Sequence, residues 1–113
     1  MIRAVLTMVV KEGCEADFER EWLAVACLTS REPGSVRQTM LRDLGVPNHY
    51  TICADWAEPV HLVAYQGSRQ RRALSAALEP LRESATRNVL EFVTDLESGV
   101  GEHPGSATRP GQP

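Results

Sequence analysis

The sequence lacks the motifs that bind nucleotides and most of those that bind metals. Its glycines at positions 13, 34, 45 and 67 are isolated, so there is neither a GxGxxG nor a Walker pattern to cradle a phosphate. The histidines His49, His61 and His103 have no Asp or Glu at a spacing typical of a metal site. A GxSxG nucleophile elbow is also absent. We therefore expect neither a cofactor nor a metal.

A basic excess, long apolar runs and paired cysteines are missing as well. The net charge of −3 argues against a nucleic-acid binder. No apolar run approaches the roughly 20 residues of a membrane span, and residues 1–10 are too short and strand-like for a signal peptide. The odd number of cysteines, without CxxC spacing, indicates reduced structural thiols. We expect a cytoplasmic protein that binds neither nucleic acid nor a membrane.

What is present reads as one domain followed by a tail. Ile2 to Lys11 alternates as a strand and has apolar groups on both faces. Phe18, Trp22, Val25 and Thr29 follow at helical spacing, with Ala26 beside them. The further elements are expected at Ser35 to Leu44 (strand), His49 to Trp56 (strand), Pro59 to Gly67 (helix), Arg69 to Ala85 (helix, bent or restarted at Pro80) and Val89 to Leu96 (strand).

This order predicts an α+β, ferredoxin-like βαββαβ fold over residues 1–98, with a four-stranded antiparallel sheet and helices on one face. The polar segment 99–113 is expected to be a disordered tail. One helical layer would leave part of the apolar first strand uncovered on the other face of the sheet. A homodimer is the simplest way to bury it.

The stretch from Asn48 to Ser68 is the most informative part of the chain. Ile52 and Trp56 share a strand face with Tyr50 and Ala54, whereas Cys53 points to the other face. Trp56 ends this apolar stripe just before a helix folds back across the sheet, so it is well placed to line a cavity. The alternative is that the ring only fills the core.

Arginines cluster in the region that follows, at positions 69, 71, 72, 82 and 87. One interpretation is a solvated helix face. The sharper one is that Arg72 or Arg82 anchors an anionic or phenolic ligand.

Four segments resemble the antibiotic biosynthesis monooxygenase family of small dimeric ferredoxin-like proteins. They are KEGCEADFEREW (Lys11 to Trp22), REPGS (Arg31 to Ser35), LRDLGVPNHYTICADW (Leu41 to Trp56) and the helix after it. The resemblance covers about residues 1–97. It rests mainly on Trp56, because a strand ending in Trp precedes the second helix in this family. The chain looks most similar to members from aromatic polyketide pathways.

The resemblance implies a dimeric α/β-barrel that oxidises an anthrone-type polyketide to a quinone with O2 and without flavin, haem or metal. Trp56 and Tyr65 would then be catalytic, as donors to the developing phenolate or peroxide. The candidate substrate-binding residues are Gln38, Ile52, His61 and Arg72. The partners expected are a second copy of the chain, a small polycyclic aromatic substrate and O2.

The chain also departs from the family. Ile52 stands where some polyketide members have Asn, and Tyr65 stands where many other members have His. Haem-degrading relatives use a strand Asn and a helical His that this chain lacks, and the proton acceptor is left unassigned. Two further functions stay open: a polyketide cyclase or aromatase, and a noncatalytic dimeric module that binds an aromatic metabolite.

Overall fold

The alternating and periodic stretches form four strands and three α-helices in a computed structural model that describes residues 1–98. The elements in chain order are β1 (Ile2–Val10), α1 (Glu15–Thr29), β2 (Ser35–Arg42), β3 (His49–Trp56), α2 (Pro59–Gln66), α3 (Arg69–Leu78), the short 3₁₀ helix η1 (Glu79–Leu81) and β4 (Arg82–Glu91). This confirms the predicted ferredoxin-like fold. The expected tail, 99–113, lies outside the described residues.

The strands form one antiparallel sheet in the order β2-β3-β1-β4. β1 is central and pairs with β3 from Ile2 opposite Trp56 to Val9 opposite His49. In this register Ala4 lies directly opposite Ala54. Because paired residues share a face, the two smallest apolar side chains of the inner strands lie side by side under the helices.

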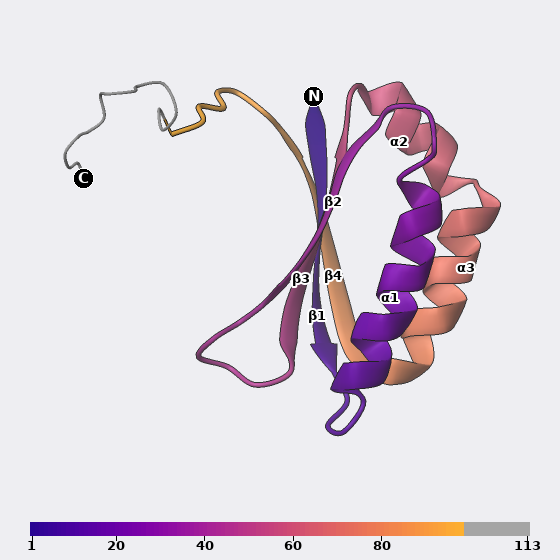
Figure 1. The fold of residues 1–113 in the computed structure, drawn as a ribbon, viewed down its shortest axis with the longest axis vertical. Helices are drawn as coiled ribbons and strands as arrows, with labels where there is room; N and C mark the ends of the chain where they lie inside the picture. Colours follow the sequence, from indigo (N-terminus) through magenta and orange to yellow (C-terminus); the bar gives the residue numbers. More distant parts are fainter. Residues whose placement is uncertain (99–113) are drawn as a thin grey trace.

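The helices all cover the same face of the sheet (Figure 1). α1 buries one stripe at helical spacing, and Val25, which was predicted to belong to it, is only half-buried. The buried side chains of this layer form two clusters. The first contains Met8, Val10, Phe18, Trp22, Ala26, Tyr50, Ile52 and Leu78, and the second contains Ile2, Ala4, Ala54, Trp56, Leu62 and Tyr65.

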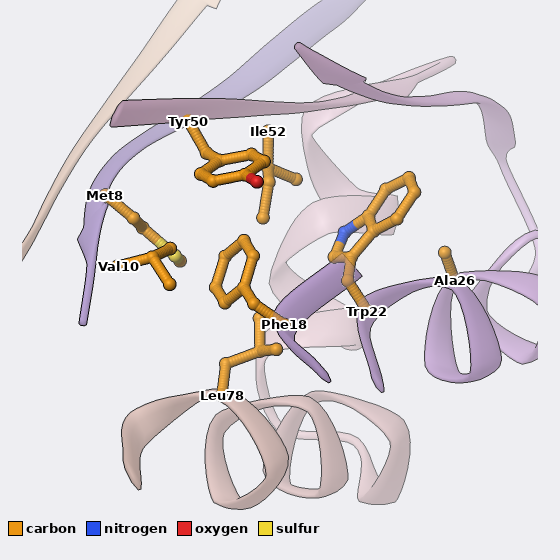
Figure 2. Packing of buried hydrophobic residues seen from close by; sticks show 8 residues of the cluster. All are labelled: Met8, Val10, Phe18, Trp22, Ala26, Tyr50, Ile52 and Leu78. Carbon is orange, nitrogen blue, oxygen red and sulfur yellow. The ribbon is translucent and has the colours of Figure 1, made fainter. Parts of the chain in front are cut away.

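The first cluster is built mainly from large side chains. Figure 2 shows the Phe18 ring between Tyr50 of β3 and Leu78 of α3. The Phe18 and Tyr50 ring centroids are 5.1 Å apart. The Tyr50 hydroxyl donates to Glu19 Oε2 at 2.6 Å, and Arg42 Nη1 donates to the same oxygen at 3.1 Å. Burial and the Glu19 hydrogen bond raise the pKa of Tyr50, because both oppose the phenolate.

The other face of the sheet carries no helix within residues 1–98 (Figure 1). Val5 and Val9 are half-buried there, and Leu41 and Leu90 are 53% and 54% exposed. The same face holds a bidentate ion pair in which Arg3 Nε and Nη2 donate to Asp55 at 2.7 and 2.9 Å. The side of β1 that faces away from the helices therefore carries apolar side chains, as predicted.

The end of the chain differs from the prediction. The helix expected over Arg69 to Ala85 ends at Leu78, and the strand expected at Val89 to Leu96 is β4, Arg82–Glu91. Pro80 has no N–H for an α-helical hydrogen bond, so the chain tightens into η1 and turns back. The Lys11 N–H then bonds to the Leu81 carbonyl at 2.9 Å and starts the pairing with β1. Arg82 and Arg87 consequently lie on a strand, and the prediction that they belong to a basic helical region is wrong.

Candidate active site

Small side chains open a cavity between the sheet and the helices. Ala4 and Ala54 are buried neighbours on β1 and β3, and their methyl groups leave space below α2. The enclosed cavity has a volume of about 40 Å³. The residues that line it are Ala4, Leu6, Trp22, Gln38, Ile52, Ala54, Trp56, Leu62, Tyr65, Gln66, Arg71, Leu74 and Arg87.

Two aromatic rings form one wall of this cavity. Trp56 is fully buried at the end of β3, and Tyr65 lies near the end of α2. Their ring centroids are 5.0 Å apart, with an angle of 35° between the ring planes. Their packing follows from the sequence because Pro59 starts α2 directly after the strand and returns the chain across Trp56.

The indole nitrogen of Trp56 is the unusual atom of the site. Trp56 Nε1 is buried and has no hydrogen-bond partner in the described part of the chain. A buried N–H without a partner costs about 1–3 kcal/mol, so native proteins seldom leave one unsatisfied. This donor belongs to a ring that lines the cavity.

The Tyr65 hydroxyl is also weakly bonded. Thr29 Oγ1 donates to it at 3.4 Å, which is long for a bond between hydroxyl groups. At this distance Thr29 does not hold the Tyr65 hydroxyl in a strong hydrogen bond, and a hydroxyl can both donate and accept. Trp56 and Tyr65, the two residues predicted to be catalytic, are thus brought together with hydrogen-bonding capacity in reserve.

The predicted substrate-binding residues divide between three places. Gln38 and Ile52 line the cavity, and Gln38 Nε2 donates to Ser35 Oγ at 3.3 Å. Ile52 makes an apolar wall where some family members have Asn. Arg72 lies outside the cavity, on the surface depression described below, and His61 borders neither space.

His61 instead packs against the turn that precedes β2. A Cβ atom placed on Gly34 would lie 2.1 Å from His61 Cγ, and Gly34 has a φ of +83°. Both facts require glycine at this turn. His61 Nδ1 is buried without a partner among residues 1–98. The structure therefore places His61 in the α2–turn contact.

A second, open depression lies beside the cavity. It has a volume of about 440 Å³ and is lined by Gln66, Arg71, Arg72, Ser75 and Arg87, which we call the arginine mouth. Gln66, Arg71 and Arg87 also line the enclosed cavity, so they separate the two spaces. The interior therefore faces solvent through a wall of long polar side chains.

Sequence reasoning missed several cavity residues, and some of them had a visible signal. Ala4 and Ala54 alternate correctly with neighbouring core residues, but nothing in either strand alone shows that they pair. Leu62 lies three residues before the predicted Tyr65 on the same helix face, and this spacing could have indicated it. Arg87 was counted with the basic helical region but lies beyond the helix end predicted at Ala85, and only its place on β4 brings it beside Gln66.

Two general features of the described region bear on the site. Within residues 1–98 no helix has both the length and the apolar character that crossing a membrane requires. The same residues contain no group of three or more His, Cys, Asp or Glu side chains arranged to hold a metal ion.

The fold and cavity define an α+β, ferredoxin-like protein with an aromatic-lined interior between a sheet and one helical layer. The sequence profile of the antibiotic biosynthesis monooxygenase family matches residues 1–77. The chain belongs to this family. It has no match among curated proteins.

Solved structures share the fold. A variant of SnoaB, a cofactor-independent oxygenase from Streptomyces nogalater, superposes with a TM-score of 0.77 at 24% identity, over 84% of this chain and 95% of that chain. A Caulobacter crescentus protein whose structure carries the family's name has a TM-score of 0.75 at 24% identity, over 82% and 90% of the two chains. A Nitrosomonas europaea protein of the same description has a TM-score of 0.75 at 14% identity, over 83% and 100%.

Proposed function

We propose that this protein is a cofactor-independent monooxygenase that oxidises an anthrone-type aromatic polyketide intermediate to a quinone with O2. One observation carries the proposal: the buried, unpartnered Trp56 Nε1 belongs to a ring that lines an otherwise largely apolar cavity. Membership of the monooxygenase family supports it. The description of SnoaB as a cofactor-independent oxygenase supports the same function.

The substrate itself can supply the electrons for this reaction. An anthrone methylene C–H is acidic because the resulting anion is delocalised over the fused rings, and that anion can reduce O2 by one electron. The carbon radical and superoxide then combine to a peroxide. Loss of water yields the quinone, so one oxygen atom becomes the new carbonyl and the other leaves with both methylene hydrogens.

The protein's part is to position the rings, exclude water and stabilise charge. The buried walls formed by Ile52, Ala54 and Leu62 would hold the flat ring system. Trp56 Nε1 would donate to the anionic oxygen of the anthrone or to the peroxide, and the Tyr65 hydroxyl would be the second donor.

A direct assay tests the proposal. Purified protein is mixed with dithranol, an anthrone, and O2 uptake is followed together with quinone absorbance, against heat-denatured protein as the control for spontaneous oxidation. We expect uptake of O2 in step with quinone formation. A cyclase would change a poly-ketone substrate without O2 uptake, and a noncatalytic module would bind the quinone without turnover; either result would contradict the proposed function.

Tyr65→Phe sharpens the assay, with Tyr50→Phe as its matched control. Both variants remove a hydroxyl from a buried tyrosine, but the Tyr50 hydroxyl bonds to Glu19 and Tyr50 does not line the cavity. We expect Tyr65→Phe to lower kcat by about 10²-fold, the lower range for a positioned proton donor, while Tyr50→Phe retains the wild-type rate. Equal rates in the two variants would remove Tyr65 from the mechanism.

We also propose that the protein acts as a homodimer. Val5, Val9, Leu41 and Leu90 place apolar surface on the face of the sheet that carries no helix, and a second sheet would cover it. Sedimentation equilibrium at micromolar concentration should give the mass of two chains. A monomer would contradict this assembly.

A further inference from the structure

The arginine mouth concentrates positive charge on a protein of net charge −3. Arg71, Arg72 and Arg87 all border one depression, and no Asp or Glu among residues 1–98 lines it. Within residues 1–98, Arg3, Arg20 and Arg42 each have a carboxylate partner, whereas these three have none within salt-bridge distance. Charge of one sign gathered around a hollow attracts the opposite charge.

The three guanidinium groups are instead held by neutral acceptors. Arg71 Nη1 donates to Ser75 Oγ, and Arg72 Nη1 donates to the Gly67 carbonyl at 3.1 Å. In the amide orientation that satisfies both partners, Gln66 Oε1 accepts from Arg87 Nη1 at 3.1 Å and from Arg87 Nη2. A carboxylate binds a guanidinium fork more strongly than an amide or hydroxyl does, so it can replace these acceptors.

The contact between Gln66 and Arg87 lies where the cavity and the arginine mouth meet. Both side chains belong to the wall shared by the cavity and the arginine mouth. The enclosed space of about 40 Å³ is far smaller than the roughly 300–1,000 Å³ of typical ligand pockets. A fused-ring substrate therefore needs more room than the cavity offers, and movement of Gln66 and Arg87 would join the cavity to the adjoining depression of about 440 Å³.

We propose that the arginine mouth binds a carboxylate carried by the substrate, and that this carboxylate, by displacing Gln66 from Arg87, favours the open form of the cavity, which a neutral ring system such as dithranol enters with lower affinity. The inference rests on the proposed oxygenase function and narrows its substrate class to acidic polycyclic aromatics. The rings lie against Trp56 and Tyr65, and the acidic group stays at the solvent side between Arg71 and Arg87.

Binding of two matched probes tests the proposal without turnover. Anthraquinone-2-carboxylate and anthraquinone-2-carboxamide have the same rings and differ in charge, and neither retains the methylene group that the reaction consumes. Both tryptophans of the chain, Trp22 and Trp56, line the cavity, so quenching of their fluorescence reports entry of the rings. We expect the carboxylate to bind about tenfold more tightly than the amide, and raising the salt concentration to reduce this preference.

Single substitutions identify the arginines that cause the preference for the carboxylate probe. Arg71→Gln and Arg87→Gln should each lose most of the preference for the carboxylate, a change of about five- to tenfold in Kd for that probe alone. Arg69→Gln is the matched control, because Arg69 is exposed on the same helix as Arg71 and lines neither space. Far-UV circular dichroism establishes that each variant is folded.

The outcomes separate this proposal from the proposed function. Acid selectivity that depends on Arg71 and Arg87 supports the arginine mouth even if dithranol is not oxidised. Equal affinity for the two probes, or selectivity that both variants retain, overturns the arginine mouth even if dithranol is turned over.

Discussion

The two clusters under the helices are built from similar elements but differ in how they are filled. The Phe18 cluster packs large side chains, and its one buried phenol donates a strong hydrogen bond to Glu19. The Trp56 cluster pairs alanine with alanine across β1 and β3 and leaves an indole N–H unpartnered within residues 1–98. Most of its members line the cavity, to which the Phe18 cluster contributes only Trp22 and Ile52. The Phe18 cluster therefore mainly stabilises the fold. The Trp56 cluster is less completely packed and hydrogen-bonded, and it forms most of the cavity.

The largest effect is expected in the Phe18 cluster. Phe18→Ala removes a fully buried ring between β3 and α3, so the free energy of unfolding should fall by about 3–5 kcal/mol. Urea denaturation measures this change. Leu23→Ala, on the same helix but 57% exposed, is the control and should cost less than about 1 kcal/mol. A small loss for Phe18→Ala would show that this cluster is not the main source of stability.

Trp56→Phe tests the role of the unpartnered indole N–H in the Trp56 cluster. The substitution keeps an aromatic ring but removes the indole N–H, so kcat for dithranol should fall by the equivalent of about 2.7–4 kcal/mol in folded protein. That N–H has no partner in the described chain, so its removal breaks no hydrogen bond. The free energy of unfolding should therefore fall by less than it does when a hydrogen-bonded donor is removed. Folded Trp56→Phe that turns over at the wild-type rate would exclude the donor role.

A pair of alanine variants compares the packing directly. Ala26 lies in the Phe18 cluster and Ala54 beside the cavity, and both are nearly buried. Ala26→Val should overpack and lose about 1–3 kcal/mol of stability with its kcat retained. Ala54→Val should keep its melting temperature, since it fills existing space, and lose turnover. Equal destabilisation by both variants would mean that the two ends are packed alike.

The smallest effect concerns Tyr50 and pH. Tyr50→Phe should lower stability by about 1 kcal/mol at neutral pH, because it removes one satisfied hydrogen bond. The pKa of Tyr50 is raised in the folded state, so its contribution is fully present below the unfolded value of about 10 and is lost as the pH rises through the folded value. Urea midpoints of wild type and variant should therefore converge at alkaline pH. A constant difference would contradict the assigned bond.

The sequence by itself determined the ferredoxin-like order, because its strands alternate with period two and its helices have clear starts at Glu15 and Pro59. The alternation also placed Ile52 and Trp56 on the helical face and Cys53 on the other. These properties depend only on residues near one another in the chain.

The tertiary structure decided the rest, because it depends on which distant residues meet. β4 is an edge strand of mostly exposed polar residues, RESATRNVLE, so no hydrophobic pattern marked its start, and pairing with β1 fixed it at Arg82. The register set Ala4 against Ala54 and thereby created the cavity. Pairing of β4 with β1 brought Arg87 to Gln66 of α2, and the return of α2 across the sheet placed His61 against Gly34. The spacing of residues along the chain does not encode these contacts.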